Sequence, residues 1–289
     1  MARLEDYDTD ERLSATVRET TRLTPDDYDD EVRNLVLEVD ASNFTFRAGQ
    51  SIGLIVPGPH ELGQDEHFRL YTVANPIGNA GSRPRIEICV KRCFYIDEVS
   101  GERYPGVASN YLCDRKAGDT LIITGPYGLP FDLPDDKAAD ILMIGLGTGI
   151  APFRAFVRHI YEEVGGWQGK VRLFYGARSG LELLYMNDRQ NDFASYYDEK
   201  TFEAFEAVSP HPHLAHLDED IPLEQTMERH REEVWNMVLK PDTHVFVAGL
   251  EKMREPLDNA FAKMAGSDEK WQRRKAELTA GGRWVELLY

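Results

Sequence analysis

The first half of the chain carries short apolar segments that are separated by clusters of glycine, proline and aspartate. This pattern predicts β-strands over Val32–Val39, Ser51–Val56, Arg69–Ala74, Arg85–Val90 and Thr120–Thr124. Strands at this spacing, without long helical intervals, are typical of a barrel or a sandwich. The segment 124–134 is rich in glycine and proline, so we place a domain boundary near Pro134.

From Ile141 the pattern changes to strands that alternate with helices. It predicts further strands at Ile141–Ile144, Lys170–Tyr175, Ala204–Ser209, His244–Ala248 and Trp284–Leu287. It predicts helices at Pro152–Glu163, Tyr185–Asp192, Leu223–Leu239 and Glu255–Ala265. Such alternation indicates a parallel sheet with helices on both faces, and such sheets bind ligands beyond the carboxyl ends of their strands.

Glycines follow three of these strands, and the clearest case is the stretch after Ile144. Gly145, Gly147 and Gly149 allow a sharp turn before a helix begins. The free amides of a helix start attract phosphate, so a diphosphate is expected over Thr148, Gly149 and Ile150. Because Ile150 replaces the third glycine, the stretch does not match the Rossmann fingerprint. An ordinary strand, turn and helix is the alternative.

Composition limits the classes of protein that are possible. A chain of 289 residues accommodates two domains, and its formal charge of −17 argues against general nucleic-acid binding. No stretch approaches the roughly 18 apolar residues of a membrane span, and the first residues are acidic rather than signal-like, so we expect a cytoplasmic protein. Cys89, Cys93 and Cys113 fit neither a disulfide framework nor a four-ligand metal site, so we expect no metal.

Charge is unevenly distributed along the chain. Residues 1–66 hold 6 Lys or Arg against 16 Asp or Glu, whereas residues 67–134 hold 8 against 7. The second segment is therefore able to present a cationic face to an acidic partner. Ordinary solvated charges are the alternative.

Two motifs in the first half suit an anionic, planar ligand. Alternation along a strand places Arg69 and Tyr71 on one face and Thr72 on the other. Gly106 precedes small side chains and a helix start, which favours a diphosphate. A half-buried strand and a plain capped helix are the corresponding structural alternatives.

Several motifs of this chain occur in the same order, and at about the same spacing, as in the plant-type ferredoxin–NADP reductase family, which the chain therefore resembles. They are Arg-Leu-Tyr-Thr from Arg69, Cys-Val-Lys-Arg from Cys89, 106–114, Thr-Gly-Pro from Thr124, 145–156, Leu-Leu-Tyr from Leu183, and 248–253. The resemblance runs from Arg69 to the final tyrosine and covers about three quarters of the chain. It implies an N-terminal antiparallel β-barrel for FAD over residues 1–134, with an acidic extension over about 1–12. It also implies a C-terminal α/β parallel-sheet domain for NAD(P) over residues 135–289.

The same resemblance implies the residues of the site. The flavin and its diphosphate are expected on Arg69, Tyr71, Thr72, Cys89, Val90, Lys91, Tyr95, Val107, Ala108, Ser109 and Tyr289. The rings of Tyr71 and Tyr289 are expected on opposite faces of the flavin, although a terminal residue is often frayed. NADPH or NADH is expected at Lys116, Thr148, Gly149, Ile150, Arg178, Gly249, Leu250 and Met253. Thr72, Glu286 and Tyr289 are the expected catalytic residues, with Thr72 and Glu286 as a pair near flavin N5; a surface carboxylate is the alternative for Glu286.

The chain departs from the family pattern in ways that leave the nucleotide open. Ala248 replaces the family's cysteine beside nicotinamide, and Glu286 lies three residues before the final tyrosine, one more than in the plant pattern. The family's groups for the 2′-phosphate align with Leu181 or Glu182, with Pro210 or His211, and with Pro222. Glu182 would repel a phosphate and accept ribose hydroxyls, or point into solvent. Arg178, Arg189 and His211 are possible replacements, so NADH and NADPH both stay open.

The implied function is a reductase that transfers electrons between NAD(P)H and a one-electron carrier, ferredoxin or flavodoxin. Because the chain has no ferredoxin-like cysteine cluster, the carrier is expected to be a separate protein. It would dock on a basic face made of Arg83, Arg85, Lys91, Arg92, Arg103, Arg115 and Lys116. The alternatives are a non-catalytic or regulatory flavin-binding subunit, the reductase component of an oxygenase, and a free-flavin reductase.

Overall fold

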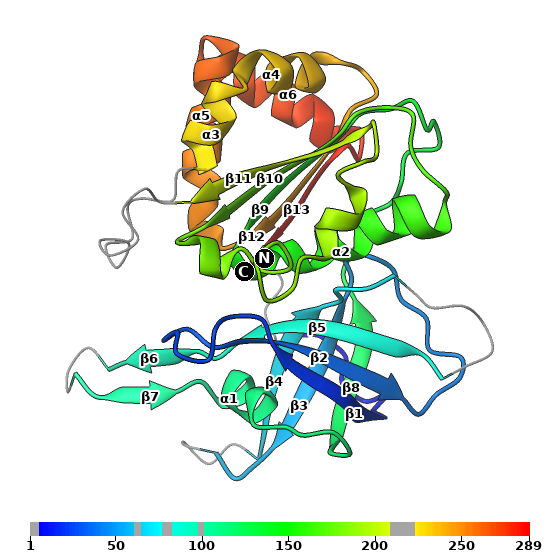
Figure 1. Ribbon diagram of the computed structural model, residues 1–289, viewed down its shortest axis with the longest axis vertical. Helices are drawn as coiled ribbons and strands as arrows, with labels where there is room; N and C mark the ends of the chain where they lie inside the picture. Colours follow the sequence, from blue (N-terminus) through cyan, green and yellow to red (C-terminus); the bar gives the residue numbers. More distant parts are fainter. Residues whose placement is uncertain (1–5, 61–64, 77–82, 98–100, 209–222) are drawn as a thin grey trace. The chain divides into compact units, whose positions relative to one another are not determined.

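The chain folds into two compact units, each with its own sheet (Figure 1). The computed structural model describes residues 6–60, 65–76, 83–97, 101–208 and 223–289. The units are Met1–Pro130 and Phe131–Tyr289, whereas the sequence placed the boundary near Pro134. Phe131 belongs to the second unit because its ring packs against Phe246, with 4.9 Å between the centroids.

The first unit contains a six-stranded sheet in which every pairing is antiparallel, in the order β4-β3-β8-β1-β2-β5. Its strands are β1 (Leu13–Arg22), β2 (Val32–Val39), β3 (Ser51–Pro57), β4 (Glu66–Thr72), β5 (Arg85–Lys91) and β8 (Thr120–Tyr127). β1 pairs with the late strand β8, with Leu13 opposite Ile123. The two edges of the sheet meet where Val73 bridges Ile88. The antiparallel barrel is therefore confirmed.

The side chain of Asn75 strengthens this closure. Its amide donates to the carbonyl oxygen of Arg85 at 2.9 Å and accepts from the backbone N–H of Glu87 at 2.6 Å. Asn75 is buried and thus replaces a pair of ladder hydrogen bonds where β4 has ended.

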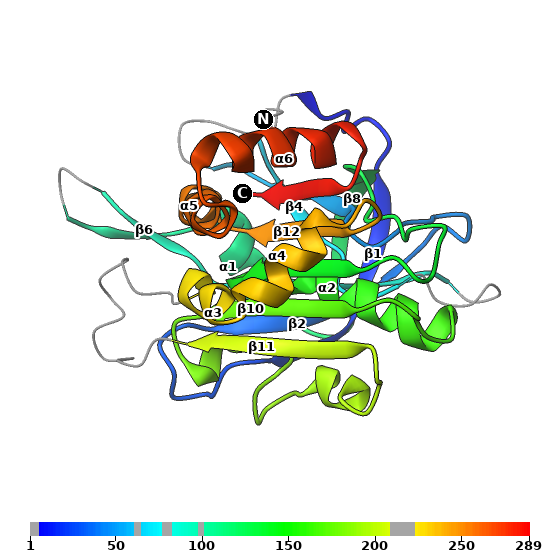
Figure 2. The ribbon, with the colours of Figure 1, turned by 90° about the horizontal axis from the view of Figure 1, so that it is seen from above.

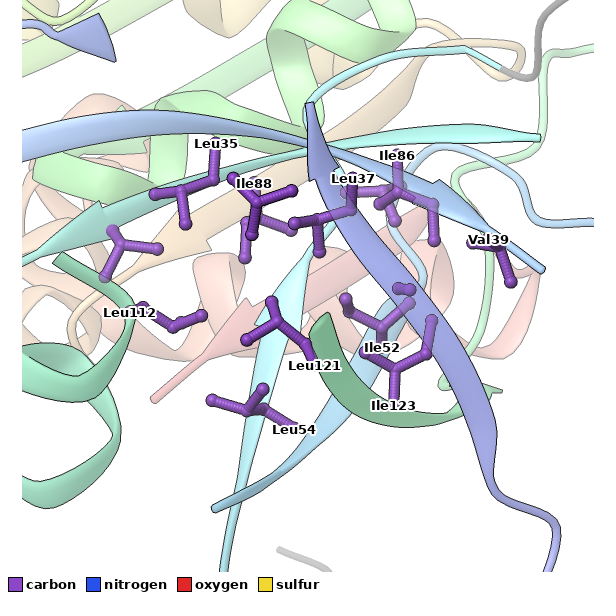
Figure 3. Packing of buried hydrophobic residues seen from close by; sticks show 14 of the residues in the cluster. Leu35, Leu37, Val39, Ile52, Leu54, Ile86, Ile88, Leu112, Leu121 and Ile123 are labelled. Atoms are coloured by element: carbon purple, nitrogen blue, oxygen red, sulfur yellow. The ribbon is translucent and has the colours of Figure 1, made fainter. Parts of the chain in front are cut away.

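The interior of the barrel is filled by the inward residue of each alternating pair, as Figure 3 shows for Leu35, Leu37 and Val39 of β2. Leu112 of the short helix α1 (Val107–Cys113) belongs to the same cluster. Fully burying one such side chain contributes about 1.5–3 kcal/mol. The apolar pattern of the sequence did not predict β1, because only two residues of that strand, Ala15 and Val17, are buried.

Two further features of the first unit lie outside the barrel sheet. β6 (Phe94–Ile96) and β7 (Arg103–Pro105) form a separate two-stranded ribbon. The described part of the acidic extension lies on the barrel: the Tyr7 ring packs edge-on against Tyr127, and Arg12 forms an ion pair with Glu66.

The second unit contains five parallel strands in the order β11-β10-β9-β12-β13 (Figure 2). They are β9 (Ile141–Leu146), β10 (Val171–Ala177), β11 (Phe202–Val208), β12 (His244–Gly249) and β13 (Trp284–Leu288). The strand order reverses between β9 and β12, which is where sheets of this type bind nucleotides.

Helices cover both faces of this sheet, as predicted. α2 (Ile150–Arg158), which continues into a π-helical turn over His159–Glu163, lies on one face (Figure 1). The other face carries α3 (Leu223–Arg229), α4 (Arg231–Leu239), α5 (Arg254–Ala265) and α6 (Asp268–Ala280). Leu142 and Ile144 of β9 pack into the cluster under these four helices.

Two helix predictions need correction, and one helix was not predicted. The predicted helix Tyr185–Asp192 is wrong: turns occupy this segment, with short 3₁₀ turns at Gly180–Glu182 and Asp192–Tyr196, and Tyr185 has a φ of 61° that no α-helix allows. The predicted helix Leu223–Leu239 breaks at His230 into α3 and α4. The apolar pattern did not predict α6, because only Trp271 and Leu278 are buried in it.

Within the described ranges, no helix has the length and apolar character that crossing a membrane requires.

Candidate functional site

The turn after β9 is built by glycines that allow backbones to touch. The turn Gly147–Gly149 leads directly into α2, and Gly147 has a φ of 56°. A Cβ on Gly149 would lie 2.2 Å from the carbonyl oxygen of Ala248 at the end of β12. Only glycine permits this approach, which joins the two strands at the point where the strand order reverses.

Gly145 has a different role from the one expected. It lies within β9 rather than in the turn, opposite Tyr175 of β10. A Cβ there would lie 3.1 Å from the Phe153 ring and 3.4 Å from the Tyr175 ring. The missing side chain therefore makes room for two aromatic rings.

The end of β12 completes the same edge. Gly249 has a φ of 145°, and a Cβ there would lie 2.9 Å from the carbonyl oxygen of Leu146. The same Cβ would lie 3.0 Å from the sulfur of Met253, which is buried, whereas Leu250 is exposed. The structure thus brings the expected nucleotide residues of the β9 turn and of β12 together.

Tyr289 is fixed within this edge rather than frayed. Its N–H donates to the carbonyl oxygen of Gly249 and its carbonyl oxygen accepts from Glu251, both at 3.0 Å. The phenol is hydrogen-bonded to the hydroxyl of Thr148, and the residue is 51% exposed. The ring therefore stands over the β9 turn with its backbone held on both sides.

The turn after β10 carries a partly buried ion pair. Arg178 donates to both carboxylate oxygens of Glu182, at 3.0 and 3.2 Å. Glu182 is only 9% exposed, so it does not point into solvent, whereas Leu181 is exposed. The backbone N–H of Arg189 donates to Asn187 within the same loop. Pro210, His211 and Pro222 lie outside the described residues.

Two residues that sequence reasoning missed hold this loop in place. The hydroxyl of Tyr175 lies 2.9 Å from the carbonyl oxygen of Gly147 and 3.3 Å from the backbone N–H of Leu184. Arg154, which is 6% exposed, forms a 2.5 Å ion pair with Asp192 and lies over the ring of Tyr185. Both residues occur in apolar runs, so the pattern suggested only packing.

Glu286 makes several contacts inside the second unit. Its carboxylate accepts from the Trp284 indole at 2.6 Å and pairs with Lys275 at 3.0 Å and Arg254 at 3.1 Å. Burial opposes its charge, but the hydrogen bonds from Trp284 and Lys275 outweigh burial and lower the pKa of Glu286 below its ordinary 4.5. A lowered pKa keeps the carboxylate ionised at neutral pH, so Glu286 carries no proton to donate there. The pairing with Thr72, a residue of the first unit, stays a prediction.

In the first unit, β4 presents the expected flavin residues on alternate faces. Arg69 is exposed and donates to the carbonyl oxygen of Phe68 at 2.9 Å. Tyr71 packs against the barrel core, and burial raises the pKa of its phenol far above the ordinary range. On the opposite face, the hydroxyl of Thr72 lies 3.1 Å from that of Ser51.

Helix α1 begins beside β4 with an open first turn. It packs against β3, β4 and β5, and Val107 contacts the same core cluster as Tyr71. No side chain caps the helix at Gly106. Ala108 is buried, and the hydroxyl of Ser109 accepts from the N–H of Cys93 at 3.1 Å. Such a start leaves backbone donors for an anion.

The remaining expected flavin residues lie on β5 and on the ribbon. Cys89 and Val90 are buried, and Lys91 pairs with Asp30 at 2.7 Å. Tyr95 is 50% exposed and stacks on Tyr104, with 5.4 Å between the ring centroids. Sequence reasoning missed Tyr104, which widens the aromatic surface.

Most cations of the expected basic face are already paired with carboxylates. Arg83 and Arg85 lie near Glu38, Lys91 pairs with Asp30, Arg92 pairs with Glu31 and Asp114, and Arg115 approaches Asp119. Arg103 lies 3.8 Å over the ring of Phe94, and Lys116 is exposed. The face therefore carries much less surplus charge than its lysines and arginines suggest.

Comparison with known proteins supplies relatives for both units. A family model described as the oxidoreductase NAD-binding domain matches residues 143–258. The chain is 33% identical to the chloroplastic leaf isozyme 1 of ferredoxin–NADP reductase from Oryza sativa subsp. indica, over 93% of this chain and 74% of that protein. It is 31% identical to the ferredoxin–NADP reductase of Spirulina sp, over 89% of this chain and 88% of the relative. The chain spans 63% of the relative from Synechocystis sp., with 33% identity.

Solved structures agree on the fold. The ferredoxin–NADP⁺ reductase of Plasmodium falciparum superposes with a TM-score of 0.74 and covers 98% of both chains at 18% identity. A point mutant of that protein in complex with 2′P-AMP gives a TM-score of 0.71. At this identity the match supports the fold alone.

Proposed function

Because the chain belongs to the ferredoxin–NADP reductase family, we propose that it is an FAD-dependent oxidoreductase that transfers electrons between NAD(P)H and a separate one-electron carrier. The observation that carries the proposal is the contact between Gly149 and Ala248, which joins the β9 turn to β12 where the strand order reverses. Nucleotides bind at such a point in sheets of this type.

The residues of the first unit fit a flavin dinucleotide. Arg69 would bind the diphosphate together with the open amides of Val107, Ala108 and Ser109, because an uncapped helix start and an exposed guanidinium both favour phosphate. The half-buried ring of Tyr71 would support the flavin, and the stacked rings of Tyr95 and Tyr104 would support adenine. When bound, FAD supplies the conversion between hydride and single electrons.

The residues of the second unit fit a pyridine nucleotide. The turn residues Thr148, Gly149 and Ile150 would hold the diphosphate at the start of α2, and no atom lies within 4 Å of a Cβ built on Gly147. Gly249 and Met253 would border the nicotinamide. Since the Tyr289 ring is bonded to Thr148 in the same place, nicotinamide entry would require this hydrogen bond to break.

The ion pair between Arg178 and Glu182 would determine how well a 2′-phosphate is accepted. It lies after β10, the strand that follows the nucleotide turn, where an acidic residue selects a ribose hydroxyl and an arginine accommodates a phosphate. Here both groups are present and neutralise each other. NADPH acceptance would therefore require Arg178 to leave Glu182.

Anaerobic titration of the purified protein tests the proposal. We expect a yellow protein that holds about one FAD per chain, that NADH or NADPH bleaches, and that ferredoxin or flavodoxin reoxidises. A colourless protein that does not take up FAD would contradict the proposal.

Ala248, which replaces the family's cysteine, favours a second candidate function, a regulatory flavin-binding subunit. FAD retention without NAD(P)H-dependent dye reduction would support this second candidate.

A further inference from the structure

The hydroxyl of Tyr175 lies at the junction of two loops of the second unit. We infer that Tyr175 is a positioning residue that couples the β9 turn to the turn after β10, so that both loops present their groups to one nucleotide. This role rests on the proposed function, because it assigns these two loops to the same pyridine nucleotide. The coupling is carried by one oxygen atom.

The Tyr175 oxygen both donates and accepts hydrogen bonds, and its partners come from both turns. It donates its single proton to the carbonyl oxygen of Gly147 at 2.9 Å, with the carbonyl oxygen of Glu182 at 3.3 Å as a second acceptor. It accepts from the N–H of Leu184 at 3.3 Å. One side of the hydroxyl therefore meets the turn that would hold the diphosphate, and the other meets the turn that carries Glu182.

The ring is held so that the hydroxyl has little freedom. Tyr175 is fully buried in β10, directly opposite Gly145 of β9. A larger residue than glycine at position 145 would press on the rings of Tyr175 and Phe153. The pairing of a glycine with a tyrosine across two central strands thus places the oxygen at the end of the sheet.

The second anchor of the loop explains why its position is transmitted. The N–H of Asp192 donates to the carbonyl oxygen of Tyr185 at 2.9 Å, and the carboxylate of Asp192 pairs with Arg154 of α2. The segment from Glu182 to Asp192 is therefore tied at its start by Tyr175 and at its end by α2. A shift of the β9 turn, which leads into α2, reaches this segment from both ends.

Removing the hydroxyl alone leaves each turn with bonds of its own, because the carbonyl oxygen of Gly147 still accepts from the N–H of Ile150 and the N–H of Leu184 still donates to the carbonyl oxygen of Glu182 at 2.9 Å. The hydrogen bonds that join the two turns through this hydroxyl are lost, so the two turns would separate or admit water. We expect Tyr175→Phe to weaken the binding of ADP-ribose to the full-length, FAD-loaded protein by about tenfold. ADP-ribose is the suitable probe because it carries the diphosphate that both loops would bind and lacks the nicotinamide ring.

Tyr161→Phe is the matched control. It removes another tyrosine hydroxyl of the same unit, which lies 3.0 Å from the hydroxyl of Thr201, before the amino end of β11. Calorimetric titration with ADP-ribose should give this variant the affinity of the unmodified protein within about twofold. An equal loss in both variants would overturn the role of Tyr175, because it would show a general loss of packing.

Hydrogen exchange provides the signature that a merely structural role would not give. In Tyr175→Phe, peptides that cover 145–150 and 180–186 should both exchange faster, and the KM for the nucleotide should rise more than kcat falls. Faster exchange in only one of the two peptides, or an unchanged affinity for ADP-ribose, would overturn the inference.

If Tyr175→Phe does not fold, the unmodified protein provides the test. ADP-ribose should then slow exchange in both peptides, and protection of only one peptide would overturn the coupling. An unmodified protein that binds FAD but not ADP-ribose would overturn the proposed function together with this role.

Discussion

The two units build their binding surfaces in different ways. At the carboxyl edge of the parallel sheet, the site is made by main chains that touch, and Gly149 and Gly249 allow the contact. In the first unit, the candidate surface is made by side chains such as Arg69 of the barrel and Tyr95 of the ribbon, which project from strands. A site made of main-chain contacts tolerates almost no change in side-chain volume. A site made of projecting side chains loses one interaction at a time.

The largest expected effect concerns the contact between Gly149 and β12. Gly149→Ala places a Cβ against the carbonyl of Ala248, and we expect it to lower the free energy of unfolding of the second unit by about 3 kcal/mol or more. Gly147→Ala meets open space and should cost only about 1–2 kcal/mol for its positive φ. Urea unfolding followed by tryptophan fluorescence measures this unit alone, because all four tryptophans lie in it. Equal costs would show that main-chain contact is not what defines this edge.

The next effect tests the side-chain surface of the barrel. Arg69→Ala should weaken FAD binding by about 10- to 100-fold, because a charged guanidinium contact to a diphosphate is lost. The barrel itself should unfold at the same urea concentration, since Arg69 is exposed. Arg18→Ala, an exposed arginine of β1, is the control and should leave FAD affinity unchanged. Fluorescence of released flavin gives the dissociation constant, and equal effects of the two changes would remove Arg69 from the site.

The ion pair between Arg178 and Glu182 is a side-chain interaction that lies on a loop at the main-chain edge of the parallel sheet. Glu182→Gln keeps the shape of the side chain but frees Arg178 for a 2′-phosphate, so the ratio of kcat/KM for NADPH over NADH should rise about tenfold. Asp188→Asn removes the same charge from an exposed position on the same loop and should change the ratio less than twofold. A ratio that does not respond to Glu182→Gln would place the 2′-position elsewhere.

Glu286 provides a test by pH. Because its pKa is lowered in the folded protein, its contribution to stability is complete above the ordinary value of 4.5 and disappears as the pH falls through the folded value. Glu286→Gln should therefore lower the free energy of unfolding by about 1 kcal/mol at pH 7, and the difference from the unmodified protein should vanish in acid. Glu277→Gln, an exposed carboxylate of α6, serves as the control. A difference that persists unchanged in acid would show that the paired charge of Glu286 does not stabilise the unit.

The smallest effect concerns carrier docking. Since most cations of the basic face are paired, raising the ionic strength from about 0.05 to 0.3 M should raise the KM for ferredoxin only about two- to fivefold. Lys116→Gln should reduce this dependence more than Arg83→Gln, because Arg83 already pairs with Asp40. A KM that does not change with salt would exclude the basic face as the docking surface.

The contrast between the units also explains what the sequence predicted. Glycine spacing predicted the β9 turn, because clustered glycines after an apolar strand mark a sharp turn whether the glycine is needed for its positive φ, as at Gly147, or for a distant contact, as at Gly149. The strand pattern predicted the parallel sheet with helices on both faces, and the family resemblance identified the barrel. The segment 185–192 was wrongly predicted as a helix because its conformation depends on distant groups, the buried Arg154 and the hydroxyl of Tyr175. No local pattern encodes such contacts.

The flavin surface could not be predicted from residues alone. Arg69 and Tyr71 occur on a strand that is also consistent with simple packing, and only the order of several motifs distinguished the two interpretations. Tyr104 escaped notice because its stacking on Tyr95 arises from the register of the ribbon β6–β7. The ion pairs that neutralise the cations of the basic face could not be predicted either, because they depend on which strands are neighbours.

The pairing of β1 with β8 has a consequence for how the protein is made. Leu13 reaches its partner Ile123 only after more than a hundred residues have been synthesised. Until β8 leaves the ribosome, the nascent barrel exposes an unpaired strand edge and an open apolar interior. The parallel sheet of the second unit starts at Ile141, so its first strand is synthesised shortly after β8, which ends at Tyr127. Slow translation between the two units would thus favour correct assembly of the first.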